Sequence, residues 1–276
     1  MKTNYGLSKI KEKLHRGLNS DHLKLRKFQN KIEIDITVGS YQVKTASTKR
    51  EVIESLQLRH QVFYAEFLGK NHPTGLDLDR YDTFFDHLIV VDKKTQNLVA
   101  TYRLYSSQFG DDFYSKSQFD LENLKFVPGP ILEIGRACVQ KNYRKSTVLA
   151  CLWRGIFEYL KVSKGRTLMG CGSVKTENPD EVARLNLFFE KNNYVHPKAF
   201  CPPLTNYQMA VPSLESLDEI SEANCSEMIP SLFRSYLKAG AKVSRFPAWD
   251  KDFKCVDYLI ILDTSQMLGN YEKKYS

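Results

Sequence analysis

The sequence has no long hydrophobic run. No apolar stretch in its 276 residues approaches the roughly 18 that a membrane-spanning helix needs, and the first residues lack the apolar block of a secretory signal. Hydrophobic residues make up 42% of the chain and charged residues 26%, which is ordinary for a globular protein with a sizeable core. We therefore expect a cytoplasmic protein.

Cysteine is sparse and shows no pattern. The six cysteines are Cys138, Cys151, Cys171, Cys201, Cys225 and Cys255. They show neither the close pairing of a disulfide framework nor the spacing of metal ligands. We therefore expect reduced, mostly buried thiols, with no disulfide and no bound metal.

Two familiar catalytic motifs are also missing. The chain contains neither a Walker A phosphate loop nor a G-x-S-x-G nucleophile motif. His87 and Asp92 do have the H-x4-D spacing of the glycerolipid O-acyltransferases, but their segment, HLIVVD, is typical of a strand. Five steps of about 3.3 Å would separate the two residues there, and their side chains would face opposite sides of the sheet. We predict that they do not form a catalytic pair.

Positive charge is unevenly distributed. Residues 1–31 hold nine Lys and Arg against two acidic residues, a net of +7, whereas the whole chain carries +8. Leu7, Ile10, Leu14 and Leu18 recur there at helical spacing between lysines, which favours an amphipathic helix lying on an anionic membrane. A solvated basic extension fits equally well, and both interpretations stay open. Signatures of nucleic-acid-binding modules are absent, so we predict no nucleic-acid partner.

Hydrophobic periodicity predicts one mixed α/β domain. Alternating or continuous apolar residues predict strands at 32–45 (kinked at Gly39), 87–92, 97–106, 131–140, 167–174 and 257–263. Helical spacing predicts helices at 47–67 (with Ser47 as N-cap), 147–161, 181–191 and 228–240. Because no repeat or linker interrupts the pattern, we expect a basic segment at 1–31, a single domain at 32–265 and a tail at 266–276.

Several ionisable residues fall in segments where a core would exclude them. The stretch ILEIGRACVQ, residues 131–140, is typical of a buried strand but carries Glu133 and Arg136. Arg59 and Arg103 also lie among apolar residues. Burying an ion costs several kcal/mol unless it is paired or used. Such residues therefore form either a structural ion network or an active site.

Four aspartates occupy one ten-residue segment. They are Asp77, Asp79, Asp82 and Asp86. A charge run is usually a solvated face, but Tyr81, Phe84 and Phe85 lie between these aspartates and favour a partly buried loop.

Glu133 and Arg136 are expected to have separate partners. Residues three apart on a strand point to opposite faces unless a bulge intervenes. We expect Arg103 to pair with Glu133 and the acidic loop to pair with Arg136.

Six sequence blocks follow one another in an order that resembles the ornithine-lipid N-acyltransferases, once labelled hemolysin-like. The blocks are LRHQVFYAEF, LDLDRYDTFFDHLIVVD, LVATYRLY, LEIGRACV, CLWRGIFEYL and FPAWDKDF. The first four are also similar to blocks of the acyl-homoserine-lactone synthases. The resemblance implies a GNAT-type fold, in which a mixed, splayed central sheet flanked by helices holds an acyl thioester between two strands. It also implies transfer of a fatty acyl group, commonly 3-hydroxylated, from acyl-carrier protein to the α-amine of an acceptor such as ornithine, the first step of ornithine lipid synthesis.

The resemblance also implies roles for particular residues. It assigns the family's charged positions and pocket to Arg59, Phe63, Asp79, Asp82, Arg103, Glu133 and Arg136. Glu133 would act as the base in aminolysis of the thioester, in a catalytic group with Arg103 and Arg136. Arg59 would bind the acceptor carboxylate, and Asp79 or Asp82 its side-chain ammonium. Backbone N–H groups near Cys138 and Val139 would stabilise the tetrahedral oxyanion.

The predicted donor site departs from the wider GNAT pattern. Those enzymes carry a glycine-rich pyrophosphate loop before the long helix, whereas this chain has YRKSTVLA. Carrier-bound phosphopantetheine presents a single phosphodiester, so the departure favours a carrier-protein donor and no permanently bound cofactor. Backbone N–H groups near Ser146 and Thr147 would bind the phosphate. Arg144 and Lys145 would add charge and help dock an acidic carrier, although a solvated charge pair is the alternative.

Three other functions stay open on the sequence alone. One is an N-acyl amino acid synthase with a different acceptor, which shares every block. Another is a signal synthase of the acyl-homoserine-lactone type, which fits FPAWDKDF and the extended C-terminal region poorly. The third is a non-catalytic protein that binds lipid or carrier. If the basic segment binds lipid, the protein would sit peripherally at the inner face of the membrane.

Overall fold

The strands and helices fall into two units along the chain. The computed structural model describes residues 25, 28–71, 73–144, 146–212 and 222–267. Unit 1 comprises Met1–Leu104 and Arg136–Tyr159, and unit 2 comprises Tyr105–Gly135 and Leu160–Ser276. The chain passes from one unit to the other within three elements, which are β4 (Leu98–Ser106), β5 (Ile131–Val139) and α3 (Ser146–Val162).

Unit 1 contains an antiparallel sheet. Its strands follow the chain order β1 (Asp35–Val38), β2 (Tyr41–Thr45), β3 (Asp86–Asp92) and β4. The strands predicted at 87–92 and 97–106 are confirmed as β3 and β4, which pair as a hairpin. The single kinked strand predicted at 32–45 is wrong, because the chain reverses at Gly39. The φ angle of this glycine is +59°, in the left-handed region that glycine adopts without strain, so β1 and β2 pair as a hairpin.

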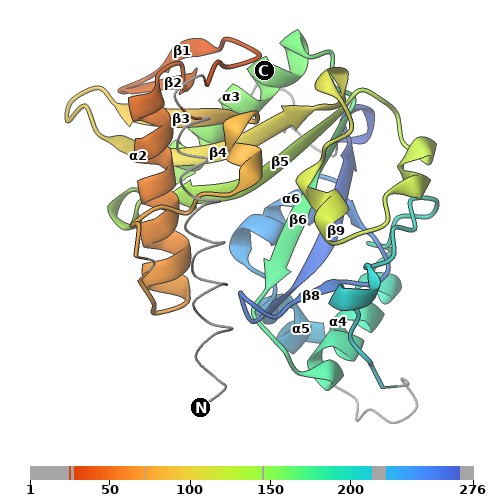
Figure 1. Cartoon of the computed structure of the whole chain (residues 1–276). Coiled ribbons are helices and arrows are strands. Elements are labelled where there is room, and N and C mark those ends of the chain that lie inside the picture. Colours follow the sequence, from red (N-terminus) through yellow and green to blue (C-terminus); the bar gives the residue numbers. More distant parts are fainter. Residues whose placement is uncertain (1–24, 26–27, 72, 145, 213–221, 268–276) are drawn as a thin grey trace, which may run out of the picture. The chain divides into compact units, whose positions relative to one another are not determined.

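Two helices cover opposite faces of this sheet. Ile89 of β3 packs in one apolar cluster with Leu56 of helix α2 (Lys49–His60). The neighbouring residue Leu88 faces α3 instead, since a Cβ added at Gly155 would meet the Leu88 side chain at 2.8 Å. Successive strand residues point to opposite faces, so α2 and α3 lie on either side of β3 (Figure 1).

Helix α2 begins one residue later than predicted. Thr48 is the N-cap: its side chain accepts a hydrogen bond from the backbone N–H of Glu51, whose carboxylate accepts from the N–H of Thr48 in return. After His60 the chain continues as a π-helical segment, η2 (Gln61–Phe67). Such segments are frequent at functional sites.

The core of unit 1 extends N-terminal to the predicted domain boundary. Leu25 is fully buried and Phe28 is 8% exposed, and both pack in the cluster that contains Leu56 and Ile89. The predicted amphipathic segment with Leu7 and Leu18 lies outside the described residues, so its membrane role stays a prediction.

Unit 2 contains a mixed sheet. Ile131–Glu133 of β5 runs parallel to β6 (Thr167–Val174), and β6 is antiparallel to β9 (Cys255–Asp263). The short strands β7 (Lys242–Val243) and β8 (Ala248–Asp250) pair with β9. Among its described residues, unit 2 contains the helices α4 (Pro179–Lys191), α5 (Glu222–Met228) and α6 (Ser231–Lys238). Helix α6 starts later than the prediction of 228 because Pro230 is its N-cap.

Aromatic side chains join the helices of unit 2 to its sheet. The ring of Tyr258 on β9 lies 4.8 Å from that of Phe189 on α4 and 6.2 Å from that of Phe233 on α6. All three residues are buried. Across the described chain, nine strands combine parallel and antiparallel pairs and are flanked by helices. This is the mixed α/β class that the sequence predicted.

Candidate active site

The acidic loop, residues 76–86, is folded by its own side chains. Asp79 is the N-cap of the 3-10 turn η3 (Arg80–Thr83), and its Oδ1 accepts from the backbone N–H of Tyr81 at 2.8 Å. In return, Asp82 Oδ2 accepts from the N–H of Asp79 at 2.8 Å. Tyr81 is only 5% exposed, so the aromatic residues do bury the loop, as predicted.

Helix α2 supplies the first cation of the site. Arg59 is 1% exposed and donates from Nε to Asp77 Oδ2 at 2.7 Å. Its two terminal nitrogens donate to Asp82 at 2.5 and 3.2 Å. Burial alone would lower the pKa of Arg59, but the carboxylates of Asp77 and Asp82 outweigh burial and raise it. Arg59 is therefore a permanent, fully paired cation.

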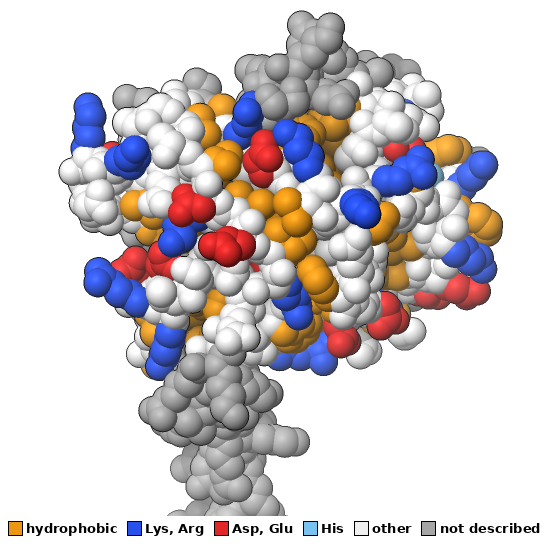
Figure 2. Space-filling model, turned by 90° about the horizontal axis from the view of Figure 1, so that it is seen from above, with side chains coloured by type: hydrophobic (Ala, Val, Ile, Leu, Met, Phe, Trp, Pro, Cys, Tyr) orange, Lys and Arg blue, Asp and Glu red, His pale blue; other side chains and the backbone are white. Residues whose placement is uncertain are grey.

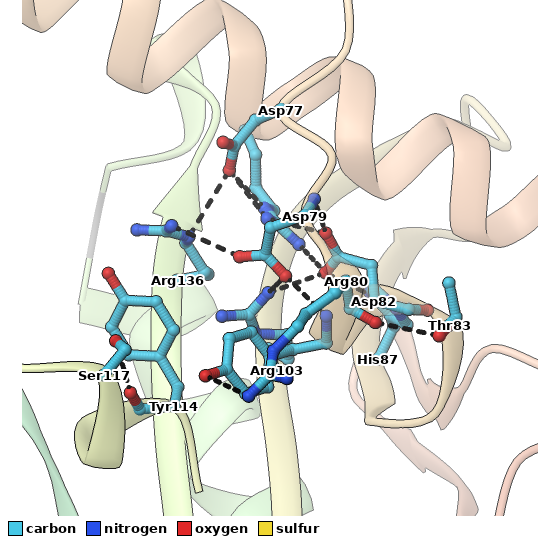
Figure 3. Close-up of polar contacts among 12 residues, drawn as sticks. Asp77, Asp79, Arg80, Asp82, Thr83, His87, Arg103, Tyr114, Ser117 and Arg136 are labelled. Carbon is cyan, nitrogen blue, oxygen red and sulfur yellow. Dashed lines mark hydrogen bonds and ion pairs between the residues drawn. The ribbon is translucent and has the colours of Figure 1, made fainter. Parts of the chain in front are cut away.

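Strand β4 supplies the second cation. Arg103 is 3% exposed and donates from one terminal nitrogen to Asp79 at 2.7 Å and to Asp82 at 2.9 Å (Figure 3). Asp82 thus lies between Arg59 and Arg103 with no exposed surface. Burial alone would raise the pKa of Asp82, but these two guanidinium groups hold it well below its usual range. Asp82 is ionised and serves as the centre of the arrangement.

Strand β5 supplies the third cation. Arg136 lies 3.5 Å from Asp77 and 3.4 Å from Asp79, measured from guanidinium nitrogen to carboxylate oxygen (Figure 3). The predicted pairing of Arg136 with the acidic loop is confirmed. Its φ angle is +52°, a left-handed conformation that is uncommon for arginine and is found at functional sites. The Arg136 guanidinium carbon lies 5.8 Å from the centre of the Phe63 ring on η2.

These six residues form the Arg–Asp cluster. Its members are Arg59, Asp77, Asp79, Asp82, Arg103 and Arg136. The three positive and three negative charges balance, which offsets the cost of burying them. The side chains of Asp79 and Arg136 are 25% and 17% exposed, whereas those of the other four are exposed by 5% or less. The cluster therefore presents one carboxylate and one guanidinium side by side at its outer edge.

His87 is buried beneath this cluster. Its Nε2 lies 3.2 Å from the backbone oxygen of Asp82, which can only accept, so Nε2 carries the proton. Its Nδ1 lies 3.2 Å from Ser55 Oγ. Burial lowers the pKa of His87 to about 4, despite the opposing effect of Asp82, so the ring is neutral near pH 7. Asp92, at the far end of β3, instead accepts from the Tyr143 hydroxyl at 3.0 Å, which confirms that the H-x4-D spacing is not a catalytic pair.

Glu133 belongs to unit 2 and is 3% exposed. Its carboxylate accepts from the backbone N–H of Tyr114 at 2.6 Å and from the N–H and hydroxyl of Ser115 at 2.8 and 2.5 Å. Arg103, its predicted partner, belongs to unit 1, where Asp79 and Asp82 bind it. The Glu133–Arg103 pair stays a prediction, as do the catalytic roles.

The predicted donor region lies around the start of α3. Arg144 pairs with Glu66 at 2.6 Å and donates from Nε to the backbone oxygen of Val139 at 3.0 Å. Helix α3 starts two residues further on, and Thr147 in its first turn is exposed. Lys145 lies outside the described residues. Arg144 therefore has a carboxylate neighbour that the sequence analysis did not anticipate.

Cys138 on β5 is an inert thiol. It is 2% exposed, and burial raises its pKa well above the usual range. The predicted stabilisation of the oxyanion would use the backbone N–H groups near Cys138 and Val139, and it stays a prediction. Within the part of the chain that is described, no group of three or more His, Cys, Asp or Glu side chains could hold a metal ion.

Sequence reasoning missed three contributors. Asp77 had no assigned role, although it binds both Arg59 and Arg136. Tyr114 and Ser115, which bind Glu133, lie in DDFYSKSQFD, a segment without strand or helix periodicity. Only the proximity of Asp77 to the other aspartates was a signal, because contacts across long chain separations leave no local pattern.

Two solved structures that resemble this chain have TM-scores below 0.5. One is a CoA-dependent acyl-homoserine lactone synthase, BjaI, with SAM and isopentyl-CoA: its TM-score is 0.47, its identity 14%, and the match covers 79% of each chain. The other is a putative N-acetyltransferase from Lactobacillus plantarum, with a TM-score of 0.42, 12% identity, and coverage of 81% of this chain and 97% of that one.

Sequence comparisons cover most of the chain. Residues 58–154 match the family described as an acetyltransferase (GNAT) domain, a segment that includes the whole Arg–Asp cluster and Glu133. The L-ornithine N(alpha)-acyltransferases of Rhodobacter capsulatus and Agrobacterium fabrum are each 27% identical to this chain. The matches cover 86% of this chain and 95% and 86% of those proteins, respectively. The chain is therefore an acyltransferase with a GNAT domain, and over most of its length it is similar to the L-ornithine N(alpha)-acyltransferases.

Proposed function

We propose that this chain transfers a fatty acyl group, commonly 3-hydroxylated, from acyl-carrier protein to the α-amine of ornithine, the first step of ornithine lipid synthesis. The name of its relatives, L-ornithine N(alpha)-acyltransferase, supports this acceptor. The observation that carries the proposal is the outer edge of the Arg–Asp cluster, where Asp79 and Arg136 expose opposite charges next to each other.

This edge is complementary to a basic amino acid. Ornithine has an α-carboxylate and a side-chain ammonium, so it needs one cationic and one anionic contact. Arg136 would bind the carboxylate, since a guanidinium can contact both of its oxygens, and Asp79 would bind the ammonium. Phe63, whose ring lies near Arg136, would line the same pocket.

Arg59 and Asp82 take a different role in this proposal from the one the sequence suggested. Arg59 is 1% exposed and two aspartates already bind it, so it would orient the cluster instead of contacting the acceptor carboxylate. Asp82, which has no exposed surface, would hold Arg59 and Arg103 in place. The substrate contacts would fall to the two members of the cluster that water reaches.

The reaction is aminolysis of a thioester. Glu133, directly or through water, would take a proton from the α-ammonium of ornithine, because only the free amine is a nucleophile. The amine attacks the thioester carbon, and backbone N–H groups near Cys138 and Val139 would stabilise the oxyanion. Collapse of this intermediate forms the amide, breaks the carbon–sulfur bond and releases the phosphopantetheine thiol, which takes up the second amine proton.

The donor would be bound at the start of α3. The phosphodiester of carrier-bound phosphopantetheine would accept from backbone N–H groups at Ser146 and Thr147, where a helix N-terminus favours an anion. Arg144 and Lys145 would add positive charge and meet the acidic surface of the carrier. Glu66 pairs with Arg144 and balances part of its charge. Arg144 and Lys145 therefore support docking less strongly than two uncompensated cations would.

The protein would work in the cytoplasm, in peripheral contact with the inner face of the membrane. No helix in the described ranges is long and apolar enough to cross a bilayer. On the face in Figure 2, Lys and Arg are scattered among acidic and apolar side chains, whereas residues 1–31 hold a net charge of +7. The basic segment would therefore supply most of the attraction to anionic lipid.

Acyl transfer in vitro tests the proposal. The purified protein is incubated with acyl-carrier protein loaded with a 3-hydroxy fatty acid, or with the matching acyl-CoA, and with ornithine, lysine or S-adenosylmethionine. We expect Nα-acyl-ornithine from the carrier-bound donor, identified by fragmentation mass spectrometry. A lysine product of equal yield would refute selectivity for ornithine, acyl-CoA of equal efficiency would refute the carrier preference, and methylthioadenosine from S-adenosylmethionine would indicate a lactone synthase.

Glu133→Gln tests the catalytic base. The amide cannot accept the amine proton, and loss of a general base commonly lowers the rate about 10² to 10⁴-fold. The amide nitrogen would face the backbone N–H of Tyr114 or the donors of Ser115, so we also expect a stability loss of about 1–3 kcal/mol. Activity is therefore measured well below the unfolding temperature of the variant. Near-wild-type turnover would remove Glu133 from the mechanism.

A further inference from the structure

Glu133 holds the first residues of a short turn in unit 2. The 3-10 turn η5 (Tyr114–Ser117) begins with the two backbone N–H groups that Glu133 binds, at 2.6 and 2.8 Å. The Ser115 hydroxyl adds a third donor at 2.5 Å, and Ser115 has no exposed surface. One side chain from β5 therefore fixes the start of the turn.

The end of the same turn is bound to another strand. Gln118, the residue after η5, is 1% exposed and donates to Asp257 Oδ2 on β9 at 3.0 Å. Its side-chain oxygen accepts from the Cys171 thiol at 3.4 Å, and Cys171 Sγ lies 3.5 Å from Ser115 Oγ. A continuous polar path thus runs from Glu133 through Ser115, Cys171 and Gln118 to Asp257.

We propose that Ser115 is a positioning residue for Glu133 and that the contact between Gln118 and Asp257 holds the turn that presents Ser115. This inference rests on the proposed function, in which Glu133 removes the proton from the acceptor amine. Ser115 does not contact substrate. It acts by fixing the orientation of the Glu133 carboxylate and by stabilising its ionised form.

The physical reason is the strength of a charge-assisted hydrogen bond. A hydroxyl that donates to a carboxylate favours the ionised form, which is the form able to accept a proton. Both groups of Ser115 bind the same oxygen, Oε1, whereas the N–H of Tyr114 binds Oε2. The two contacts together prevent rotation of the carboxylate. Of these three donors, the hydroxyl is the one that a side-chain substitution removes.

The other titratable groups near Glu133 in unit 2, including the carboxylate of Asp257 at the end of the polar path, are the same in all the proteins compared below. Tyr105 on β4 is close enough to interact with Glu133; burial, followed by Asp112 and Asp111, raises the pKa of this phenol. Cys171 on β6 contacts Ser115. Neither a phenol nor a thiol ordinarily changes its charge below pH 7. Asp111 is exposed and pairs with Lys116, which lowers the pKa of Asp111.

The test is the pH dependence of kcat/KM for acyl transfer to ornithine. The wild type is compared with Ser115→Ala, with Ser115→Thr, which restores a hydroxyl, and with Ser117→Ala. Ser117 is the matched control, since its hydroxyl lies in the same turn but donates to the backbone oxygen of Tyr114 at 2.7 Å. The titration of the substrate amine is common to all four proteins, so differences between their profiles come from the enzyme.

We expect Ser115→Ala to lower kcat about 10- to 100-fold and to move the acid limb upward by about one pH unit, because the ionised carboxylate has lost a donor. Ser115→Thr should return the limb toward the wild-type position, and Ser117→Ala should leave it there. If Ser115→Ala does not fold, Ser115→Cys replaces it, because a thiol of similar size is a weak donor and should also raise the limb.

Two results would overturn the inference. One is a pH profile of kcat/KM whose acid limb lies at the same pH in Ser115→Ala as in Ser117→Ala, while the wild type is active. The other is a lowered kcat with an unshifted limb that Ser115→Thr does not restore, which would make Ser115 merely structural. A wild type that forms no acyl-ornithine would refute the proposed function instead, so the two failures are distinguishable.

Discussion

The substitution Asp82→Asn should show what holds the Arg–Asp cluster together. Asp82 has no exposed surface and accepts hydrogen bonds from Arg59 at 2.5 and 3.2 Å and from Arg103 at 2.9 Å. Asparagine has nearly the same shape but no charge, and its amide nitrogen would point a donor at donors. The buried guanidinium groups of Arg59 and Arg103 would then lose the carboxylate that lies between them.

The expected loss of unfolding free energy is large because Asp82 is fully buried. Removing one partner from a buried ion pair costs about 3–5 kcal/mol, since the remaining charge stays buried without compensation. That is a large part of the roughly 5–15 kcal/mol that stabilises an ordinary domain. Asp79→Asn is the matched control: it changes a carboxylate that Arg103 also contacts, but one that is 25% exposed. Asparagine also caps a helical turn well, so we expect the control to lose less than about 2 kcal/mol.

Urea unfolding can report on unit 1 alone. The chain has two tryptophans, of which Trp153 is buried in unit 1 and Trp249 belongs to unit 2. In a Trp249→Phe background, fluorescence follows Trp153, and the linear extrapolation at pH 7 gives the free energy of unfolding of its surroundings. A loss below about 1 kcal/mol for Asp82→Asn, or a loss no larger than that of Asp79→Asn, would refute the argument from burial.

The effect of Asp82 should also depend on pH. The pKa of Asp82 is depressed in the folded protein, so its contribution is fully present above the unfolded pKa of about 3.9 and is lost as the pH falls through the folded pKa. The difference between wild type and Asp82→Asn should therefore stay constant from pH 7 to about pH 5 and shrink only in stronger acid. A difference that disappears near pH 6 would contradict this assignment.

Two other predictions concern stability. The unfolded chain protonates His87 near pH 6.5, whereas burial keeps the folded pKa at about 4, so this group should cost the wild type about 3 kcal/mol of stability as the pH falls between these values. His87→Gln should remove that part of the decrease in unfolding free energy with pH, measured by urea unfolding. A variant whose unfolding free energy falls with pH as steeply as that of the wild type would contradict this. Deleting residues 1–24 should preserve acyl transfer and weaken sedimentation with anionic vesicles, whereas deleting residues 1–31 should also lower the unfolding temperature. The longer deletion removes Leu25 and Phe28 from the core, at about 1.5–3 kcal/mol each; equal unfolding temperatures, or a shorter form that binds vesicles fully, would refute it.

Local pattern was enough to locate most elements and several ionisable residues that the fold buries or pairs. The apolar runs in HLIVVD and LVATYRLY predicted β3 and β4. Because successive side chains of a strand point to opposite faces, the prediction also separated His87 from Asp92. The apolar face of residues 147–161 predicted α3. Charged residues in apolar segments identified Arg59, Arg103, Glu133 and Arg136, because burying an ion without a use is costly.

Smaller errors arose where one residue changes the backbone. Gly39 was interpreted as a kink but is the turn of a hairpin. Ser47 and Thr48 are both good N-caps, and the reciprocal bond with Glu51 favours Thr48. Leu25 and Phe28 were assigned to the basic segment outside the predicted domain, yet they are buried. The composition of a segment describes its average character, whereas packing can bury individual side chains within it.

The sequence by itself determined which charged residues are costly to bury and therefore need a purpose. Only the tertiary structure decided how they are grouped. Arg59 binds Asp77 and Asp82, 18 and 23 positions away, and Glu133 accepts a hydrogen bond from the hydroxyl of Ser115, 18 positions away. The periodicity of a segment depends on its own backbone geometry, but the partner of a buried charge depends on which distant segment the fold brings within about 3 Å.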